Sequence, residues 1–215
     1  MASEWFPKPS FFISLFEFKP CKPTSTRITM QKSQIRKSFN EQRNALSTLE
    51  VKALSQELLR QFQKLDFSNV TSIHIFLPII EKKEPDTFLL IDWLLMTHPK
   101  IKIIVPKADF ESAMMTHHVY PGREGLSKNL FNILEPLVSD PHHDEVDMVL
   151  VPMLAFDLRG YRVGYGKGFY DRFLQTINPL KVGLCFFPPI ESIDDVNEYD
   201  VRLDLCLTPE QTFKF

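Results

Sequence analysis

Residues 147–177, DMVLVPMLAFDLRGYRVGYGKGFYDRFLQTI, contain the change of pattern that decides the fold. The run 147–152 is short, apolar and β-branched, which predicts a buried strand. The run from Phe169 predicts a helix of about ten residues. Four of the chain's seven glycines lie between them, namely Gly160, Gly164, Gly166 and Gly168. A glycine-rich loop therefore leaves the carboxyl end of a strand and enters a helix.

The flanking sequence repeats this alternation of strand and helix. Residues 31–65 have apolar side chains at helical spacing and predict one or two amphipathic helices. Residues 86–98 predict another helix, with Asp86 as its N-cap. Short apolar runs predict strands at 71–78, 102–106 and 181–187. Short strands alternating with helices indicate an α/β fold with a mostly parallel sheet.

Composition excludes several classes of protein. The 215 residues carry a net charge of −2, and the pI near 6.3 provides no basic field, so we expect no nucleic acid partner. No apolar run reaches the roughly 20 residues of a membrane helix. Cys21, Cys185 and Cys206 are widely separated and form no C-x-x-C pair. We expect buried, unreactive thiols in a cytoplasmic protein that does not associate with membranes.

The first 29 residues differ from the rest. They hold four prolines and show no helical or strand period, which predicts a poorly ordered N-terminal leader. Residues 30–215 are then expected to form a single domain. The sequence predicts no oligomeric state.

The glycine loop has the chemistry of a phosphate site. Glycines let backbone N–H groups approach an anion, and a helix N-terminus adds its positive dipole end. Arg162 and Lys167 supply positive charge, and Asp171 can hold a divalent cation. The spacing fits neither a Walker A loop nor the dinucleotide fingerprint. A tight turn with solvated charges therefore remains an alternative.

Two further groups of residues are ambiguous by themselves. Lys32 and Arg36 lie four residues apart and share one helix face. They could meet the same phosphates or form a solvated face. The pairs 117–118 and 142–143 are adjacent histidines, and we expect them in solvated loops rather than at a metal.

The block LVPMLAFDLRGYRVGYGKGFYDRFL at 150–174 resembles the signature of the 5-formyltetrahydrofolate cyclo-ligase family. KSQIRK at 32–37, IFLPIIEKKEPDT at 75–87 and EYDVRLDLCLTPE at 198–210 resemble further segments of that family in the same order. The resemblance implies a three-layer α/β/α sandwich related to sugar-phosphate isomerases and CoA transferases. It implies ATP-dependent closure of 5-formyltetrahydrofolate, with or without a polyglutamate tail, to 5,10-methenyltetrahydrofolate.

The resemblance also assigns roles to residues of this chain. Arg162 and Lys167 would act in catalysis, and Asp171 and, less strongly, Asp200 would hold Mg²⁺. The folate pocket would be formed by Leu77, Glu84, Phe169 and Tyr170, with Glu84 receiving the N–H groups of the pterin. The ATP site would comprise Lys32, Arg36, Arg162, Gly164, Tyr165, Gly166, Lys167, Gly168, Phe169 and Tyr170.

The chain departs from the family pattern at two positions in the loop. Phe169 stands where many members have Tyr, and Tyr165 stands where some have Arg. Two other functions remain open at this point. One is a nucleotide- or folate-binding regulator without turnover, and the other is a sugar-phosphate isomerase on the same fold.

Overall fold

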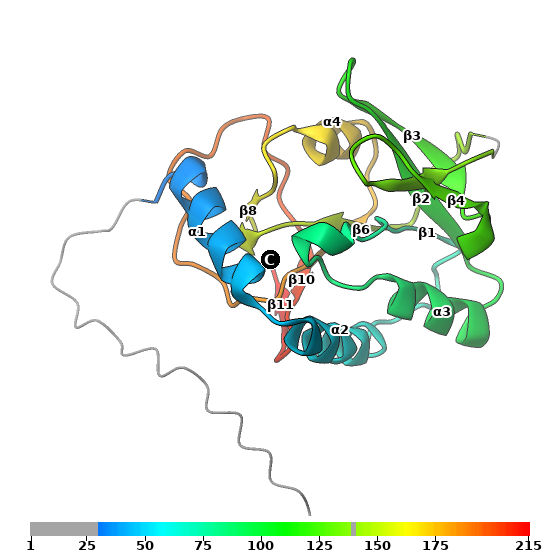
Figure 1. Ribbon diagram of the computed structural model, residues 1–215, viewed down its shortest axis with the longest axis horizontal. Helices are drawn as coiled ribbons and strands as arrows, with labels where there is room; N and C mark the ends of the chain where they lie inside the picture. The colour runs from blue at the N-terminus through cyan, green and yellow to red at the C-terminus, as the bar shows by residue number, and fades with distance from the viewer. Residues whose placement is uncertain (1–29, 139–140) are drawn as a thin grey trace, which may run out of the picture.

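The computed structural model describes residues 30–138 and 141–215 (Figure 1). The predicted leader lies outside the described residues. The α-helices are α1 (Lys32–Ala45), α2 (Thr48–Phe62), α3 (Phe88–Thr97) and α4 (Phe169–Thr176). The 3₁₀ turns are η1 (Ile80–Lys82) and η2 (Arg123–Gly125). The strands are β1 (Ser72–His74), β2 (Lys102–Asp109), β3 (Met114–Val119), β4 (Leu126–Lys128), β5 (Leu134–Pro136), β6 (Met148–Pro152), β7 (Ala155–Phe156), β8 (Arg162–Val163), β9 (Leu180–Leu184), β10 (Leu205–Leu207) and β11 (Thr212–Lys214).

Seven strands form the central sheet in the order β11-β10-β9-β6-β1-β2-β3. The five central strands run parallel, while β3 and β11 pair antiparallel at the two edges. Two small antiparallel pairs, β4 with β5 and β7 with β8, lie outside this sheet. The predicted α/β fold with a mostly parallel sheet is confirmed.

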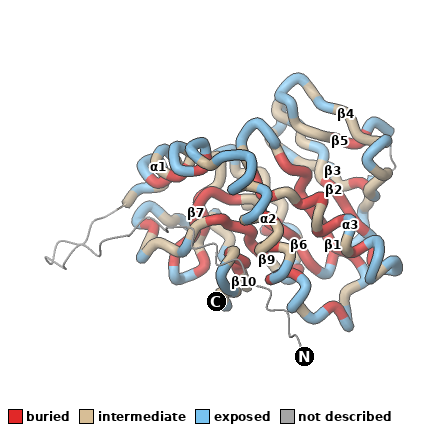
Figure 2. Tube along the Cα trace, turned by 60° about the horizontal axis from the view of Figure 1, so that its bottom comes forward, coloured by how far each residue is buried: buried red, intermediate tan, exposed pale blue. Residues whose placement is uncertain are grey.

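Alternate side chains of the central strands pack on opposite faces of the sheet. Ile73 and Leu150 face α2 and α3, where they pack with Phe62 in one buried cluster. Val149 faces the other side and packs with Leu174 of α4. Figure 1 shows α2 and α3 on one side of the sheet and α4 on the other, which gives the three predicted layers. Figure 2 shows the buried residues concentrated along the central strands.

The predicted helix 31–65 is two helices, as the pattern allowed. The chain breaks at Leu46, and α2 begins with a capping box in which Ser47 and Glu50 each accept a backbone N–H of the other. Because the chain breaks between the two helices, α1 packs beside β7 and β8 rather than on the main sheet. This position brings one face of α1 to the glycine loop.

Three details of the expected elements were wrong. The predicted strand 71–78 extends only over Ser72–His74; the Ile75 N–H still donates to the Ile104 carbonyl at 2.8 Å, but the Phe76 carbonyl accepts from the Thr87 hydroxyl. Helix α3 has Thr87 as its N-cap, although the Asp86 carboxylate still accepts the Phe88 N–H at 3.1 Å. His117 and His118 lie in β3, and His118 is buried rather than solvated.

The cysteines in the described residues are free and buried, as predicted. Burial raises the pKa of the Cys185 thiol to about 12 and raises that of Cys206 as well. Both thiols are therefore unreactive near neutral pH. Among the helices of the described residues, none combines the length and the apolar character needed to cross a membrane.

Candidate functional site

A large groove of about 1450 Å³ runs along the carboxyl ends of the central strands. Ligands of open α/β sheets bind at this edge, because the loops that leave the strands converge there. All fourteen residues predicted for the site line this one groove: Lys32, Arg36, Leu77, Glu84, Arg162, Gly164, Tyr165, Gly166, Lys167, Gly168, Phe169, Tyr170, Asp171 and Asp200. They come from α1, the segment after β1, the glycine loop, α4 and the segment before β10. The fold thus brings together residues that are up to 168 positions apart.

The glycine loop needs its glycines for conformation and for space. Gly166 and Gly168 have φ of +85° and +70°, a region that residues with a Cβ rarely adopt. A Cβ on Gly166 would also approach the Arg36 guanidinium to 3.1 Å. Arg36 Nε donates to the Gly164 carbonyl at 2.9 Å, so α1 is tied directly to the loop. The solvated alternative for Arg36 is therefore wrong.

Arg172 is a contributor that the sequence reasoning missed. Its guanidinium donates to the Lys167 carbonyl at 2.6 Å and to the Ala113 carbonyl at 2.8 Å. It thereby joins the glycine loop to the turn between β2 and β3. The signal was available, since Arg172 follows Asp171 directly in the quoted block.

Two ion pairs hold predicted ligand-binding side chains against one another. Lys32 Nζ lies 2.5 Å from Asp200 Oδ2, and both side chains are largely buried. Arg162 donates to Asp171 Oδ1 at 2.7 Å and also to the Val201 carbonyl. Burial lowers the pKa of Arg162, while Asp171 and Asp200 oppose that shift. Arg162 therefore braces the loop against the segment before β10, in addition to lining the groove.

A buried chain of polar side chains connects the glycine loop to Glu84. Glu84 Oε2 accepts the Ile79 N–H at 2.8 Å, and Oε1 accepts the Tyr165 hydroxyl at 2.5 Å. Arg43 in turn donates to the Tyr165 hydroxyl oxygen. Burial raises the pKa of Glu84, and the two donated hydrogen bonds, Arg43 and Lys82 oppose that rise. The sequence reasoning missed Arg43, although it continues the helical spacing of Lys32 and Arg36 along α1.

Aromatic and apolar side chains form the walls between these polar groups. Phe169 packs edge-on against Phe110, with ring centroids 5.4 Å apart, and Phe110 packs against Phe131 at 4.4 Å. Phe110 and Phe131 belong to the two loops beyond β2 and β4, which sequence reasoning did not assign. The Tyr170 hydroxyl is buried without a hydrogen-bond partner, and burial raises the pKa of Tyr170. An orphaned hydroxyl in a groove is a donor and acceptor that a ligand can satisfy.

The groove itself does not complete a metal site. Within residues 30–138 and 141–215, no group of three or more His, Cys, Asp or Glu side chains is arranged to hold a metal ion. Asp171 and Asp200 could supply one or two carboxylate oxygens. This number suits Mg²⁺ bound mainly through phosphates and water.

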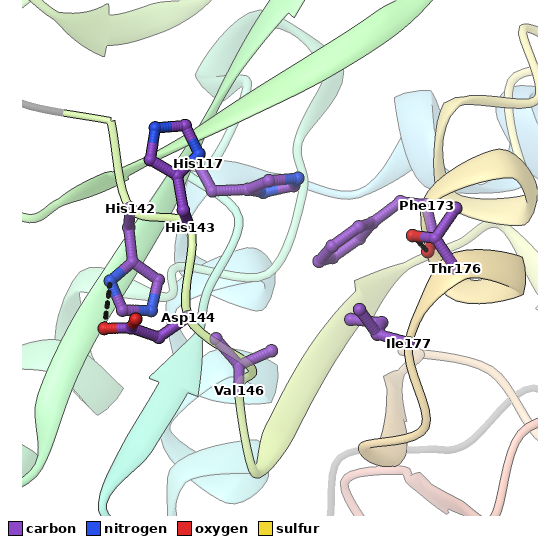
Figure 3. A pocket seen from close by; sticks show the side chains of 8 residues that line it. All are labelled: His117, His142, His143, Asp144, Val146, Phe173, Thr176 and Ile177. Atoms are coloured by element: carbon purple, nitrogen blue, oxygen red, sulfur yellow. Dashed lines mark hydrogen bonds and ion pairs between the residues drawn. The ribbon is translucent and has the colours of Figure 1, made fainter.

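Three histidines, His117, His142 and His143, line a second, smaller pocket of about 210 Å³ (Figure 3). His117 stacks on Phe173 of α4 with centroids 4.0 Å apart, and His142 lies 3.9 Å from Asp144. Burial, followed by the neighbouring His118 and His142, lowers the pKa of His117 to about 4. Helix α4 therefore lines the groove with its first turn and this pocket with Phe173 and Thr176.

Comparisons with known proteins agree with this geometry. A sequence model described as the 5-formyltetrahydrofolate cyclo-ligase family matches residues 28–209. The chain is 25% identical to the "Probable 5-formyltetrahydrofolate cyclo-ligase" of Schizosaccharomyces pombe, covering 87% of this chain and 99% of the relative. It is 27% identical to the Mycoplasma pneumoniae cyclo-ligase, covering 84% and 100%.

A solved structure has the same fold. The 5,10-methenyltetrahydrofolate synthetase of Aquifex aeolicus superposes with a TM-score of 0.73 at 31% identity, covering 86% of this chain and 93% of that one. The family match spans most of the chain and includes the glycine block. The chain therefore belongs to the 5-formyltetrahydrofolate cyclo-ligase family, whose reaction is the ATP-dependent closure of 5-formyltetrahydrofolate to 5,10-methenyltetrahydrofolate.

Proposed function

We propose that the groove binds ATP at its glycine-loop end and 5-formyltetrahydrofolate beside Glu84, and that it joins the two in one reaction. The observation that carries this proposal is the continuity of the groove. Its volume of about 1450 Å³ exceeds the roughly 300–1,000 Å³ of a pocket for one small ligand. A continuous space lined by both the cations of the glycine loop and the buried Glu84 carboxylate suits two ligands that must react with each other.

The glycine-loop end supplies the contacts for a triphosphate. The loop N–H groups, the N-terminus of α4, Lys32, Arg36 and Lys167 all line this end. Lys167 is exposed, so its ammonium can reach an incoming phosphate, whereas Arg162 is already engaged with Asp171. We therefore assign the main charge contact in the reaction to Lys167, and a bracing role beside the phosphates to Arg162.

The other end supplies the contacts for a pterin. Glu84 is a buried carboxylate that can accept ring N–H groups, and Leu77 and Phe169 offer apolar surface for the ring. The orphaned Tyr170 hydroxyl can pair with a polar atom of the folate. Phe110 and Phe131 extend this aromatic wall beyond Phe169.

The reaction then depends on the alignment of the two substrates more than on a nucleophilic side chain. The formyl oxygen attacks the γ-phosphorus, the bond to ADP breaks, and the oxygen becomes part of a good leaving group. N10 attacks the activated formyl carbon, loses its proton, and inorganic phosphate departs with the oxygen. Positioning of the two substrates and shielding of the phosphoryl charge supply the catalysis.

Three finer points belong to the same proposal. Mg²⁺ would be held by the ATP phosphates with Asp171 and, more weakly, Asp200, and would neutralise phosphoryl charge. The folate would be accepted with or without a polyglutamate tail. We also propose a cytoplasmic location. One similar protein, from Arabidopsis thaliana, is named mitochondrial, so cell fractionation is the test that separates the two compartments.

One assay tests the function. The protein is mixed with 5-formyltetrahydrofolate, ATP and Mg²⁺, and the near-ultraviolet absorbance of the methenyl product is followed. We expect absorbance that grows only with ATP present, and one ADP released per product formed. Tight binding of both ligands without product would instead indicate a regulator without turnover.

A further inference from the structure

Tyr165 has its backbone among the loop glycines, while its side chain reaches away from them to Glu84. Gly164 and Gly166 flank it, and both belong to the proposed nucleotide side. Its hydroxyl meets Glu84 and Arg43, and Lys82 Nζ lies 4.1 Å from the centre of its ring. The side chain thus acts on the carboxylate of the proposed folate side.

The direction of the hydrogen bonds follows from the groups themselves. A guanidinium has only donors, so the Tyr165 oxygen must accept from Arg43. The single phenolic hydrogen is thereby left for Glu84, which must accept it. The Ile79 N–H likewise needs an acceptor at the other carboxylate oxygen. Both oxygens of Glu84 face donors, and this arrangement favours the ionised carboxylate.

Arg43 is joined to Glu84 by hydrogen bonds through the phenol of Tyr165, in addition to its electrostatic attraction. Arg43 and Glu84 are 3% and 5% exposed, yet the ion pairs of the described residues do not include a direct contact between them. A carboxylate buried so deeply is costly unless donors surround it. Burial raises the pKa of Tyr165, which keeps the phenol protonated and able to donate at all working pH values.

We propose that Tyr165 is a positioning residue for the folate substrate, because its hydroxyl, oriented by Arg43, fixes the Glu84 carboxylate and keeps it ionised to receive the pterin N–H groups. This inference rests on the proposed function. One loop therefore serves both substrates, with its backbone at the nucleotide and this side chain at the folate. The charged and titratable groups that face Glu84 are Arg43, Lys82, Tyr165 and Tyr170.

The first test compares Tyr165→Phe with the matched control Tyr161→Phe. Tyr161 lies in the same segment and contacts Arg159 and Arg202, outside the groove. We expect Y165F to raise KM for 5-formyltetrahydrofolate about ten- to a hundredfold, the range for a lost hydrogen bond to a charged group. KM for ATP should change by less than about twofold. Y161F should leave both KM values unchanged.

The pH profile supplies a readout that loss of packing would not move. Without the phenol, the ionised form of Glu84 loses a donor, so the acid limb of kcat/KM for folate should move upward by about one pH unit. Glu84→Gln should abolish this limb. In the Glu84→Gln background, adding Y165F should change KM for folate by less than about threefold, because the two residues act as one unit.

The results that overturn the inference are distinct from those that overturn the proposed function. The role of Tyr165 would be refuted if Y165F changes only KM for ATP or keeps the wild-type acid limb. It would also be refuted if Y165F raises KM for folate as much in the Glu84→Gln background as in the wild type. If Y165F does not fold, Arg43→Lys takes its place, and a wild-type KM for folate there would refute the role equally. A wild-type protein that neither binds folate nor forms product would overturn both.

Discussion

Gly166→Ala tests whether the loop depends on the conformation described above. Gly166 has φ of +85°, where an alanine costs roughly 1–2 kcal/mol. The new Cβ would also lie 3.1 Å from the Arg36 guanidinium and press on the bond from Arg36 to Gly164, which contributes about 0.5–1.5 kcal/mol. We expect a loss of about 2 kcal/mol in the free energy of unfolding, or about 4–8 °C in Tm.

Gly164→Ala is the control, because it changes the same loop by the same methyl group. Gly164 has no strained φ, and its Cβ would meet no atom within 4 Å. We expect it to be neutral or to stabilise the fold by up to about 1 kcal/mol. Urea unfolding of the two variants gives the difference, and ATP titration of Gly166→Ala should show a raised KM. Equal stability of the two variants would refute the reasoning.

Three further predictions concern charge and titration. Lys167→Ala should lower kcat/KM for ATP by the equivalent of about 2–4 kcal/mol, and unchanged steady-state kinetics would remove Lys167 from the reaction. Asp171→Asn should raise the Mg²⁺ concentration needed for half-maximal rate, and it should also destabilise the fold because Arg162 loses its partner; an unaltered metal titration would contradict the metal role. His117 has a pKa lowered to about 4, so the unfolded chain takes up a proton first as the pH falls, and stability should decline from about pH 6.5 toward pH 4. After discounting for its partial exposure we expect about 1–2 kcal/mol from this residue. His117→Phe, which preserves the stack on Phe173, should flatten that decline in urea unfolding measured across the range.

Local signals predicted the centre of the fold well. The strand, glycine loop and helix of the quoted block each depend on residues near one another in sequence, and the structure places all three as expected. The strand β3 was missed because MMTHHV has neither a run of branched apolar residues nor clear alternation. The three-residue strands β4, β5 and β11 were missed because they are too short to show a period.

The candidate site was likewise predictable in part from the sequence. A local motif identified which residues line the groove, but it could not tell which of them pair with each other. The partnership of Arg162 with Asp171 and that of Tyr165 with Glu84 depend on how distant segments meet. Arg43 was missed because the basic residues of the first helix were interpreted as a single pair, Lys32 and Arg36. Arg172 was missed because attention went to the carboxylate that precedes it, Asp171.

The ion pair between Lys32 and Asp200 bears on the form in which the nucleotide enters. Under the proposed function, ATP alone would draw Lys32 away and leave Asp200 facing phosphate oxygens. A free divalent ion would take Asp200 and leave the ammonium facing a like charge. When metal and nucleotide arrive already joined, each side chain exchanges one opposite charge for another. If the proposed function holds, the resting pair would thus favour the magnesium–nucleotide complex over either component by itself.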